Sequence, residues 1–480
     1  MIFFLITITF LYLRTDFYIT LGCCFLINML EKYTGNDYNE FLTECYVRDY
    51  SAKKEPIPVS FRTLFPNLNK SDRYTHLIHS YPAKLLAHIP YFFLNNSYFS
   101  NIGDTILDPF CGTGTVMLEA NLAGRNAAGA DSNPLARKIA FIKTQKLDEN
   151  LLNKTLEIIL CKAKQQNVKI PEIRNRDFWF PIQTQTQLAK IRSAIGELVD
   201  NEYKIFFEVC FSNCIKKVSY ADPRIAVPVK LNPDRFEKDS EHHQKIRKRL
   251  SDLKTIDVFE KFQTICTENI IRAKTLVCLS DKVFSRIISE NAQVLTTSID
   301  KSDLLPDNSI DMILTSPPYA GAQKYIRSSS LSLSWLGLTE SENLKSLDKK
   351  SIGRENYLSS ELKEISTGIT SADKLLEILL KKNKLRYYIV GNYLLEMKIA
   401  IDEAIRVLKK DGFFIIVIGN NKVCDIEFNT QEYLTEYIHS RGLCLQFKLI
   451  DDIKSYGLMT KRNKTADIIS REWILVFKKT

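Results

Sequence analysis

The chain has 480 residues, of which 45% are hydrophobic and 25% are charged. These proportions are those of a soluble globular protein, and they exclude a mostly disordered, collagen-like or coiled-coil chain. The length allows about two or three domains, and the net charge of +10 is compatible with a polyanionic partner without requiring one.

The 11 cysteines form no CxxC pair and no Cys/His cluster with the spacing of a zinc site. Cys210 and Cys214 are four residues apart without a histidine near them, which is typical of thiols in a core. We therefore expect no metal. Cysteine usage of this kind suits a reducing cytoplasm, where we expect the protein to be located.

Residues 1–30 are strongly apolar, and their only charges are Arg14 and Asp16. The apolar runs on either side are too short to span a bilayer, and no basic stretch precedes the first run, as a signal peptide would require. Three interpretations remain open: a membrane anchor, a buried or accessory segment, and a start codon assigned too early, with Met29 as the true start. We do not expect a membrane location.

The first regular elements follow a polar stretch from 31 to 72. Residues 85–94 have the spacing of a helix, and residues 104–108 form a short apolar strand that enters a glycine-containing turn. A helix is expected over 115–123, and a second short strand over 126–131.

Asn133 and Pro134 then begin another helix, with asparagine as the N-cap and proline at the first helical position. The order strand, turn, helix, strand, helix is typical of a doubly wound α/β sheet.

The second half of the chain returns to strands after a long helical and polar stretch. An apolar strand at 309–314 runs into Thr315-Ser-Pro-Pro-Tyr319, and an amphipathic helix at 393–408 precedes a buried strand at 413–418. Segments 443–450 and 472–478 are predicted to close the sheet as an antiparallel pair.

These elements predict a sheet domain that is divided by two helical inserts. The expected parts are an N-terminal segment 1–72, a first core part 73–145, an insert 146–291, and a second core part 292–480 that contains its own insert 327–384. The 146–291 insert carries a basic run from Glu241 to Lys254, which is either a solvated helix face or a surface for a polyanion.

The turn Asp108-Pro-Phe-Cys-Gly-Thr-Gly114 is the first motif that indicates chemistry. Glycines after a strand let the backbone approach a ligand closely, and the next helix presents free N–H groups at its start. The third glycine of the dinucleotide fingerprint is absent, because Met117 stands there. Asp131 ends the next strand, where α/β nucleotide-binding folds place an acid on ribose hydroxyls. Its alternative role is helix capping, which Asn133 already fulfils.

Thr315-Ser-Pro-Pro-Tyr319 is the most specific pattern in the chain. Two consecutive prolines stiffen the loop after a buried strand and remove two N–H donors. The amino group of a nucleobase can supply donors to the loop's acceptors, and Tyr319 offers a ring on which the base can stack.

At these residues the sequence resembles the amino-methylating DNA methyltransferases, in the Ser-Pro-Pro-Tyr form of the cytosine-N4 enzymes. The segment from 108 to 114 resembles their AdoMet-binding motif, and His79-Ser-Tyr-Pro-Ala-Lys84 resembles an N-terminal AdoMet motif of some members. The resemblance covers about 73–143 and 294–479. It implies a Rossmann-like class I AdoMet-dependent methyltransferase fold, interrupted here by the two inserts.

The resemblance also implies site residues. Catalysis is expected at Ser316, Pro317, Pro318 and Tyr319. S-adenosyl-L-methionine (AdoMet) binding is expected at Tyr81, Pro82, Asp108, Phe110, Gly112, Gly114, Asp131 and Asp300. Asp300 is a candidate for the adenine amino group because the family often has an acid after the third strand, and Asp303 competes with it.

The implied substrate is a cytosine in double-stranded DNA, and the implied role is modification in a restriction–modification system with a separately encoded endonuclease. Adenine N6 and RNA bases remain alternative targets, and a non-catalytic nucleic-acid binder is an alternative of another class. C5 methylation would require a Pro-Cys nucleophile, and the chain contains no Pro-Cys dipeptide. Either insert could recognise the target, with the basic run favouring 146–291.

Overall fold

The computed structural model describes residues 36–69, 73–82, 84–320, 325–339, 344–355, 357, 361, 363–453 and 470–480. The expectations for residues 1–28, including the alternative start at Met29, lie outside the described residues. Within the described ranges, no helix is both long and apolar enough to cross a membrane.

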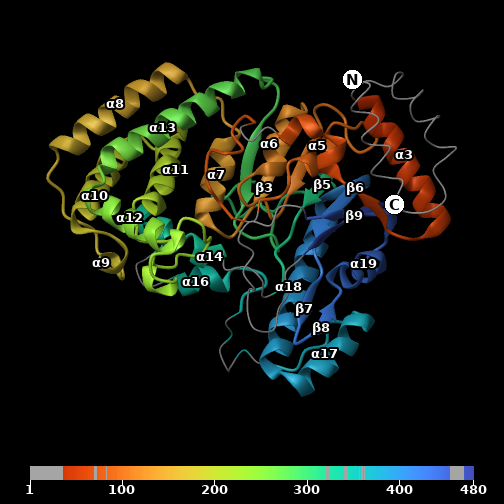
Figure 1. Cartoon of the computed structure of the whole chain (residues 1–480). Coiled ribbons are helices and arrows are strands. Elements are labelled where there is room, and N and C mark those ends of the chain that lie inside the picture. The colour runs from red at the N-terminus through yellow and green to blue at the C-terminus, as the bar shows by residue number, and fades with distance from the viewer. Residues whose placement is uncertain are drawn as a thin grey trace, which may run out of the picture.

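An eight-stranded sheet forms the centre of the molecule (Figure 1), with strand order β1-β9-β10-β6-β5-β2-β3-β4. Its strands are β1 Ile57–Val59, β2 Thr105–Asp108, β3 Asn126–Ala130, β4 Ser285–Ser289, β5 Ile310–Thr315, β6 Leu408–Ile418, β9 Leu443–Asp452 and β10 Arg471–Lys479. Strand β10 runs antiparallel to both β6 and β9, whereas the other neighbouring pairs are parallel. The predicted α/β fold, with a mainly parallel sheet and a closing antiparallel pair, is confirmed.

Helices cover both faces of the sheet. Successive strand residues point to opposite sides, and apolar residues on both sides are packed against helices. Ile106 and Met312 face one core with α3 (Asn36–Lys53), α4 (Phe61–Leu64), α5 (His88–Leu94) and α6 (Thr115–Leu122). Their neighbours Leu107 and Ile313 face the other core with α17 (Thr370–Lys382), α18 (Lys384–Val407) and α19 (Thr430–Ser440). A two-stranded hairpin, β7 Asn421–Val423 and β8 Ile426–Phe428, follows β6.

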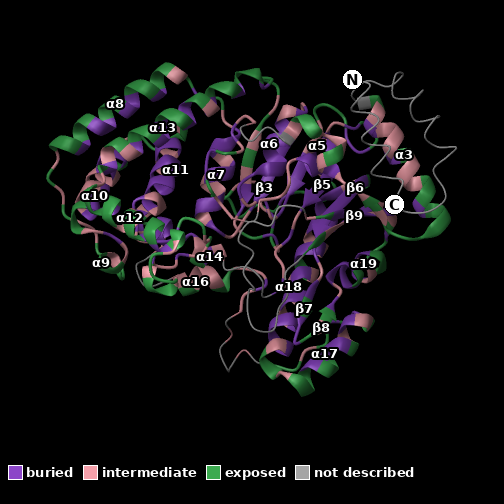
Figure 2. Cartoon of the chain, in the orientation of Figure 1, coloured by how far each residue is buried: buried purple, intermediate pink, exposed green. Residues whose placement is uncertain are grey.

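A helical lobe with its own apolar core lies beside the sheet (Figures 1 and 2). It contains α7 Pro134–Lys143, α8 Glu149–Gln165, α9 Arg176–Trp179, α10 Ile182–Gly196, α11 Glu202–Lys217, α12 Glu241–Thr255 and α13 Val258–Lys274. Short 3-10 turns lie at Pro233–Arg235 and Thr275–Cys278 in this part of the chain, and a further one lies at Pro66–Asn69, directly after α4. Fully buried aromatic residues such as Phe206, Phe211 and Phe262 fill the core of this lobe.

The second insert is divided between the two bodies. Its first helices, α14 Tyr325–Ser328, α15 Ser330–Leu336 and α16 Leu344–Lys349, adjoin the helical lobe, and Trp335 is completely buried in the core of that lobe. In contrast, α17 packs against α18 in the core of the sheet.

The structure moves two of the expected boundaries. Strand β4 pairs with β3, so the first insert ends before Ser285 rather than at 291. Strand β1 pairs with β9, and Tyr50 of α3 and Phe61 are buried against the sheet, so the described residues from 36 onward belong to the core instead of a separate N-terminal segment. A three-residue strand that contains a proline leaves too short a pattern to be recognised from the sequence.

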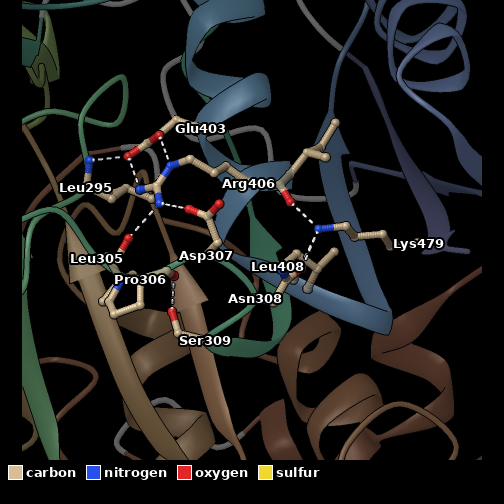
Figure 3. A network of polar contacts seen from close by, with 11 residues as sticks. Leu295, Leu305, Pro306, Asp307, Asn308, Ser309, Glu403, Arg406, Leu408 and Lys479 are labelled. Carbon is tan, nitrogen blue, oxygen red and sulfur yellow. Dashed lines mark hydrogen bonds and ion pairs between the residues drawn. The ribbon is translucent and has the colours of Figure 1, made fainter.

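A polar network fastens the β4–β5 connection to the end of α18 (Figure 3). Arg406 donates to the Leu305 carbonyl at 2.7 Å and to Asp307 at 2.5 Å, and it pairs with Glu403 at 2.8 Å. Lys479 donates to the carbonyls of Ile405 and Leu408 at 2.7 and 2.5 Å. These contacts lie where β5 and β6 begin. The carboxyl ends of the strands, at the opposite end of the sheet, are therefore not covered by this network.

Candidate active site

The strand order reverses between β2 and β5, and the two main motifs meet there. Asp108 ends β2 and Thr315 ends β5. The Thr315 hydroxyl donates to Asp108 Oδ1 at 2.6 Å, and the same oxygen accepts the Phe110 N–H at 3.1 Å. In open α/β sheets, ligands bind at the carboxyl ends of strands where the order switches.

Burial is the dominant influence on the Asp108 carboxyl group. Asp108 is 4% exposed, and its desolvation raises the pKa of this group to about 7, against hydrogen bonds that favour the charged form. The side chain therefore braces the interior of the turn, beneath the surface that a ligand would contact.

The turn after β2 needs glycine at positions 112 and 114 for backbone reasons. Gly112 and Gly114 have φ values of +48° and +74°, which residues with a side chain rarely adopt. A Cβ on Gly114 would also lie only 2.9 Å from the Ala140 Cα, because α7 packs directly against the turn. Gly114 then leads into α6, whose first N–H groups face the carboxyl edge.

Asp131 joins the glycine turn to the end of β3. Its Oδ2 accepts the Gly112 N–H at 3.0 Å, and its Oδ1 accepts the Asn133 N–H at 2.8 Å. Asn133 caps α7 by accepting the Leu135 N–H at 3.0 Å, as the sequence predicts. Burial raises the pKa of Asp131, and its backbone hydrogen bonds oppose that rise. Each carboxylate oxygen can accept a second hydrogen bond, so ribose hydroxyls remain possible partners.

The structure brings Tyr81 to the same strand end. Asn133 Nδ2 donates to the Tyr81 hydroxyl oxygen at 2.9 Å. Burial, with nearby Asp131 adding to it, raises the pKa of Tyr81 well above its ordinary value, so the phenol stays neutral. Pro82, which follows, is half-buried.

The loop Ser316 to Tyr319 leaves β5 at the carboxyl edge, with Pro317 buried and Ser316, Pro318 and Tyr319 half-buried. The Tyr319 hydroxyl lies 3.4 Å from Glu472 Oε1 at the start of β10. Burial and the facing Asp451 carboxylate raise the pKa of Glu472. No pattern in the sequence predicted the contact of Glu472, which is an acid next to the apolar part of β10.

Asp300 does not directly follow a strand in the structure. Glu290 and Asn291 are the polar residues that directly follow β4, whereas Asp300 is exposed in the loop between the bridging residues Thr296 and Leu304. The sequence patterns predicted no strand at 285–289, which lay within the expected insert 146–291, because an isolated stretch of five residues gives only a weak strand signal.

Glu290 is joined to the rest of the site through Arg137. Arg137 Nη2 lies 2.8 Å from Glu290 Oε1, and Arg137 Nη1 donates to the Asp131 carbonyl at 2.7 Å. Among the described residues, no group of three His, Cys, Asp or Glu side chains could hold a metal ion.

The fold and the carboxyl ends of these strands define a class: an α/β protein with a glycine turn, an acid after β3 and a proline-stiffened loop at one switch point. Residues 27–141 match the family model for N6/N4 methyltransferases, described as DNA methylase. The match covers residues 79–84, the glycine turn and Asp131.

Three curated relatives are type II methyltransferases. M.MvaI of Kocuria varians is 23% identical over 426 residues, which is 84% of this chain and 89% of that protein. M.BsoBI of Geobacillus stearothermophilus is 25% identical over 254 residues, covering 50% of this chain and 48% of that protein. M.MjaII of Methanocaldococcus jannaschii is 36% identical over 103 residues, covering 21% and 19% respectively.

Among solved structures, the rRNA methyltransferase aviRa from Streptomyces viridochromogenes aligns with 9% identity and a TM-score of 0.31, over 87% of this chain and 96% of that chain. This likeness is too slight to carry an argument. The family model over residues 27–141 and the type II relatives support an amino-methylating DNA methyltransferase, and they do not distinguish N4-cytosine from N6-adenine transfer.

Proposed function

We propose that this DNA methyltransferase transfers the methyl group of AdoMet to the exocyclic N4 of cytosine in duplex DNA. The observation that carries the proposal is the hydrogen bond from Thr315 to Asp108, because it fixes the glycine turn and the Ser-Pro-Pro-Tyr loop side by side. A methyl donor bound at one motif would then lie next to a base bound at the other.

AdoMet would occupy the carboxyl edge above β2 and β3, where it would supply an electrophilic methyl group on a sulfonium. The positive φ values of Gly112 and Gly114 give the turn a backbone conformation that residues with a side chain rarely adopt, and this would let the backbone approach the ligand closely. Asp131 would accept hydrogen bonds from the ribose hydroxyls. Phe110, Tyr81 and Pro82 would line the rest of the cofactor site. Glu290 replaces Asp300 in this proposal as the acid beside the adenosine, because it directly follows β4 and shares Arg137 with Asp131.

The loop after β5 would bind and orient the target base. The N4 lone pair of cytosine is delocalised into the ring, so the amino group is a poor nucleophile. Ser316 and the Pro317 carbonyl would accept hydrogen bonds from the amino group. These bonds would turn the nitrogen lone pair towards the methyl group. Pro318 would keep the loop rigid, and Tyr319 would stack on the flipped base. The acceleration would come from alignment and charge complementarity, without a covalent intermediate.

Cytosine N4 is preferred over adenine N6 because of Ser316. The resemblance associates serine at this position with N4 enzymes, whereas N6 enzymes more often have Asp or Asn there. The proposed context is the modification half of a restriction–modification system, acting on cytoplasmic DNA beside a separately encoded endonuclease.

The helical lobe is the proposed target-recognition region. On α12, Arg247, Lys248 and Lys254 are exposed, whereas Lys245 pairs with Glu241. The helices α14 and α16, which follow the Ser-Pro-Pro-Tyr loop in the chain, adjoin the helical lobe that contains α12. A duplex bound at the loop would therefore meet these cations, which suit phosphate contacts. The second insert remains the alternative reader of base edges.

The test is incubation of the purified chain with labelled AdoMet and unmethylated duplex DNA, followed by mass analysis of the nucleosides. N4-methylcytosine confined to one sequence context supports the proposal. N6-methyladenine would move the target to adenine, and label in RNA alone would move it to RNA. AdoMet binding without any transfer would indicate a non-catalytic nucleic-acid binder.

A further inference from the structure

A short segment of the second insert, residues 350–353, lies across three elements of the site. Lys350 Nζ is 3.4 Å from Glu290 Oε2, at the end of β4. The hydroxyls of Ser351 and Ser132 are 3.4 Å apart, which connects the segment to the residue after Asp131. Gly353 lies against the carbonyl of Tyr319. We call residues 350–353 the strap.

The strap is fixed to α18 as well as to the site. The Gly353 N–H donates to Glu396 Oε2 at 3.4 Å, and Ile352 packs against the core that contains α18. Just beyond the strap, Arg386 of α18 pairs with Glu355 at 3.4 Å. The strap is thus held by a long buried helix on one side and contacts the ends of β3 and β4 and the catalytic loop on the other.

Gly353 is the point where the strap and the catalytic loop are closest. Its φ is +79°, and a Cβ at this position would lie 3.0 Å from the Tyr319 carbonyl oxygen and 3.4 Å from the Tyr393 ring. Gly353 and Tyr393 are both buried. Because Tyr393 belongs to the packed helix α18, any added side chain would push on the Tyr319 backbone before it could displace the helix.

We propose that the strap is a positioning element for methyl transfer, and that Gly353 is the residue through which it sets the place of Tyr319 relative to the cofactor side of the site. The proposal rests on the proposed role of Tyr319 as the base-stacking residue. It gives the second insert a role in aligning the two halves of the site, separate from reading the DNA sequence.

The test compares Gly353→Ala with Gly442→Ala in the full chain. Gly442 has a similar φ of +87°, but a Cβ there meets nothing within 4 Å. Both variants therefore carry comparable backbone strain, and only Gly353→Ala presses on Tyr319. We expect Gly353→Ala to lower kcat by up to about 10-fold, since the Tyr319 carbonyl must shift by a few tenths of an ångström and a misplacement of about 1 Å can cost about 100-fold. The Kd for AdoMet and the KM for DNA should stay within about twofold, and Gly442→Ala should retain the wild-type kcat.

Glu396→Ala gives an independent measurement if Gly353→Ala does not fold. It removes the acceptor of the Gly353 N–H without adding atoms near Tyr319, so kcat should fall in the same direction with the AdoMet Kd unchanged. Equal kcat values for Gly353→Ala and Gly442→Ala, at equal melting temperatures, would overturn the positioning role. A rise in KM alone would overturn it as well. A wild-type chain that transfers no methyl group to DNA would contradict the proposed function instead, so the two failures are distinguishable.

Discussion

The Thr315 hydroxyl donates a 2.6 Å hydrogen bond to Asp108, and this contact connects two residues that are 207 positions apart in the chain. Both residues are buried at the carboxyl ends of neighbouring strands. Each motif begins directly after its strand. The pairing of β2 with β5 and this hydrogen bond therefore fix the distance between the glycine turn and the Ser-Pro-Pro-Tyr loop.

Thr315→Val should test this connection. Valine keeps the shape but leaves Asp108 with one hydrogen bond fewer in a buried place, which costs about 1–3 kcal/mol of unfolding free energy. We expect kcat to fall while the AdoMet Kd changes less. Denaturant unfolding and methyl-transfer assays measure the two effects, and Thr315→Ser, which keeps the hydroxyl, should resemble the wild type. A Val variant with wild-type stability would refute the role of the bond.

The raised pKa of Asp108 predicts a specific pH dependence of stability. The carboxyl group releases its proton near its ordinary pKa of 3.8 in the unfolded chain but near 7 in the folded protein. Between these values the folded state binds the extra proton, so this group makes the unfolding free energy fall as pH rises from about 4 to 7. Asp108→Asn cannot titrate. The stability of the variant relative to the wild type should therefore increase over that range and stay constant above it. Parallel stability profiles from pH 4 to 8 would contradict this expectation.

Tyr319→Ala should retain AdoMet binding and lose most methylation. Stacking of a base on an aromatic side chain contributes about 1–3 kcal/mol, and misalignment of the base adds to the loss. Tyr319→Phe is the matched control, because it keeps the ring and removes only the hydroxyl that faces Glu472. We expect the Phe variant to keep most of its turnover. AdoMet titration measures cofactor binding, and methyl-transfer assays on the same preparations measure turnover. Near-normal turnover of the Ala variant would exclude the stacking role.

Asp131→Ala should weaken AdoMet binding with little effect on DNA affinity. Hydrogen bonds to a charged group contribute about 1.5–3 kcal/mol, and the variant also frees the Gly112 N–H that Asp131 accepts. Calorimetric titration with AdoMet measures the change. An unchanged AdoMet Kd together with a lower melting temperature would mean that Asp131 only braces the start of α7.

The basic face of α12 can be tested through the salt dependence of DNA binding. Each lost phosphate contact reduces the slope of log K against log salt by about 0.9. We expect Arg247→Ala/Lys248→Ala to lower that slope and to weaken binding to all sequences alike. Lys154→Ala, on α8 at the far side of the helical lobe in Figure 1, is the control and should leave the slope unchanged. An unaltered slope in the double variant would favour the second insert as the DNA-binding surface.

Local patterns in the sequence were sufficient for the order of elements around the glycine turn and for the strand before Thr315. Apolar periodicity, glycine turns and the Asn133–Pro134 helix start act over a few residues, so they can be read directly from the chain. The same patterns predicted the antiparallel pair β9 and β10, because apolar and polar residues alternate along most of β9 and β10 contains a continuous apolar run from Trp473 to Phe477.

Only the tertiary structure decided which of these elements are neighbours. The pairing of β2 with β5 connects residues on either side of a long insert, and no local pattern records it. The position of Glu290 directly after β4, the contact of Tyr319 with Glu472 and the position of Gly353 against the Tyr319 carbonyl have the same origin. Each depends on where a strand ends or on how a distant helix packs. Those outcomes are set by long-range burial and sheet register, which the residues near each position do not encode on their own.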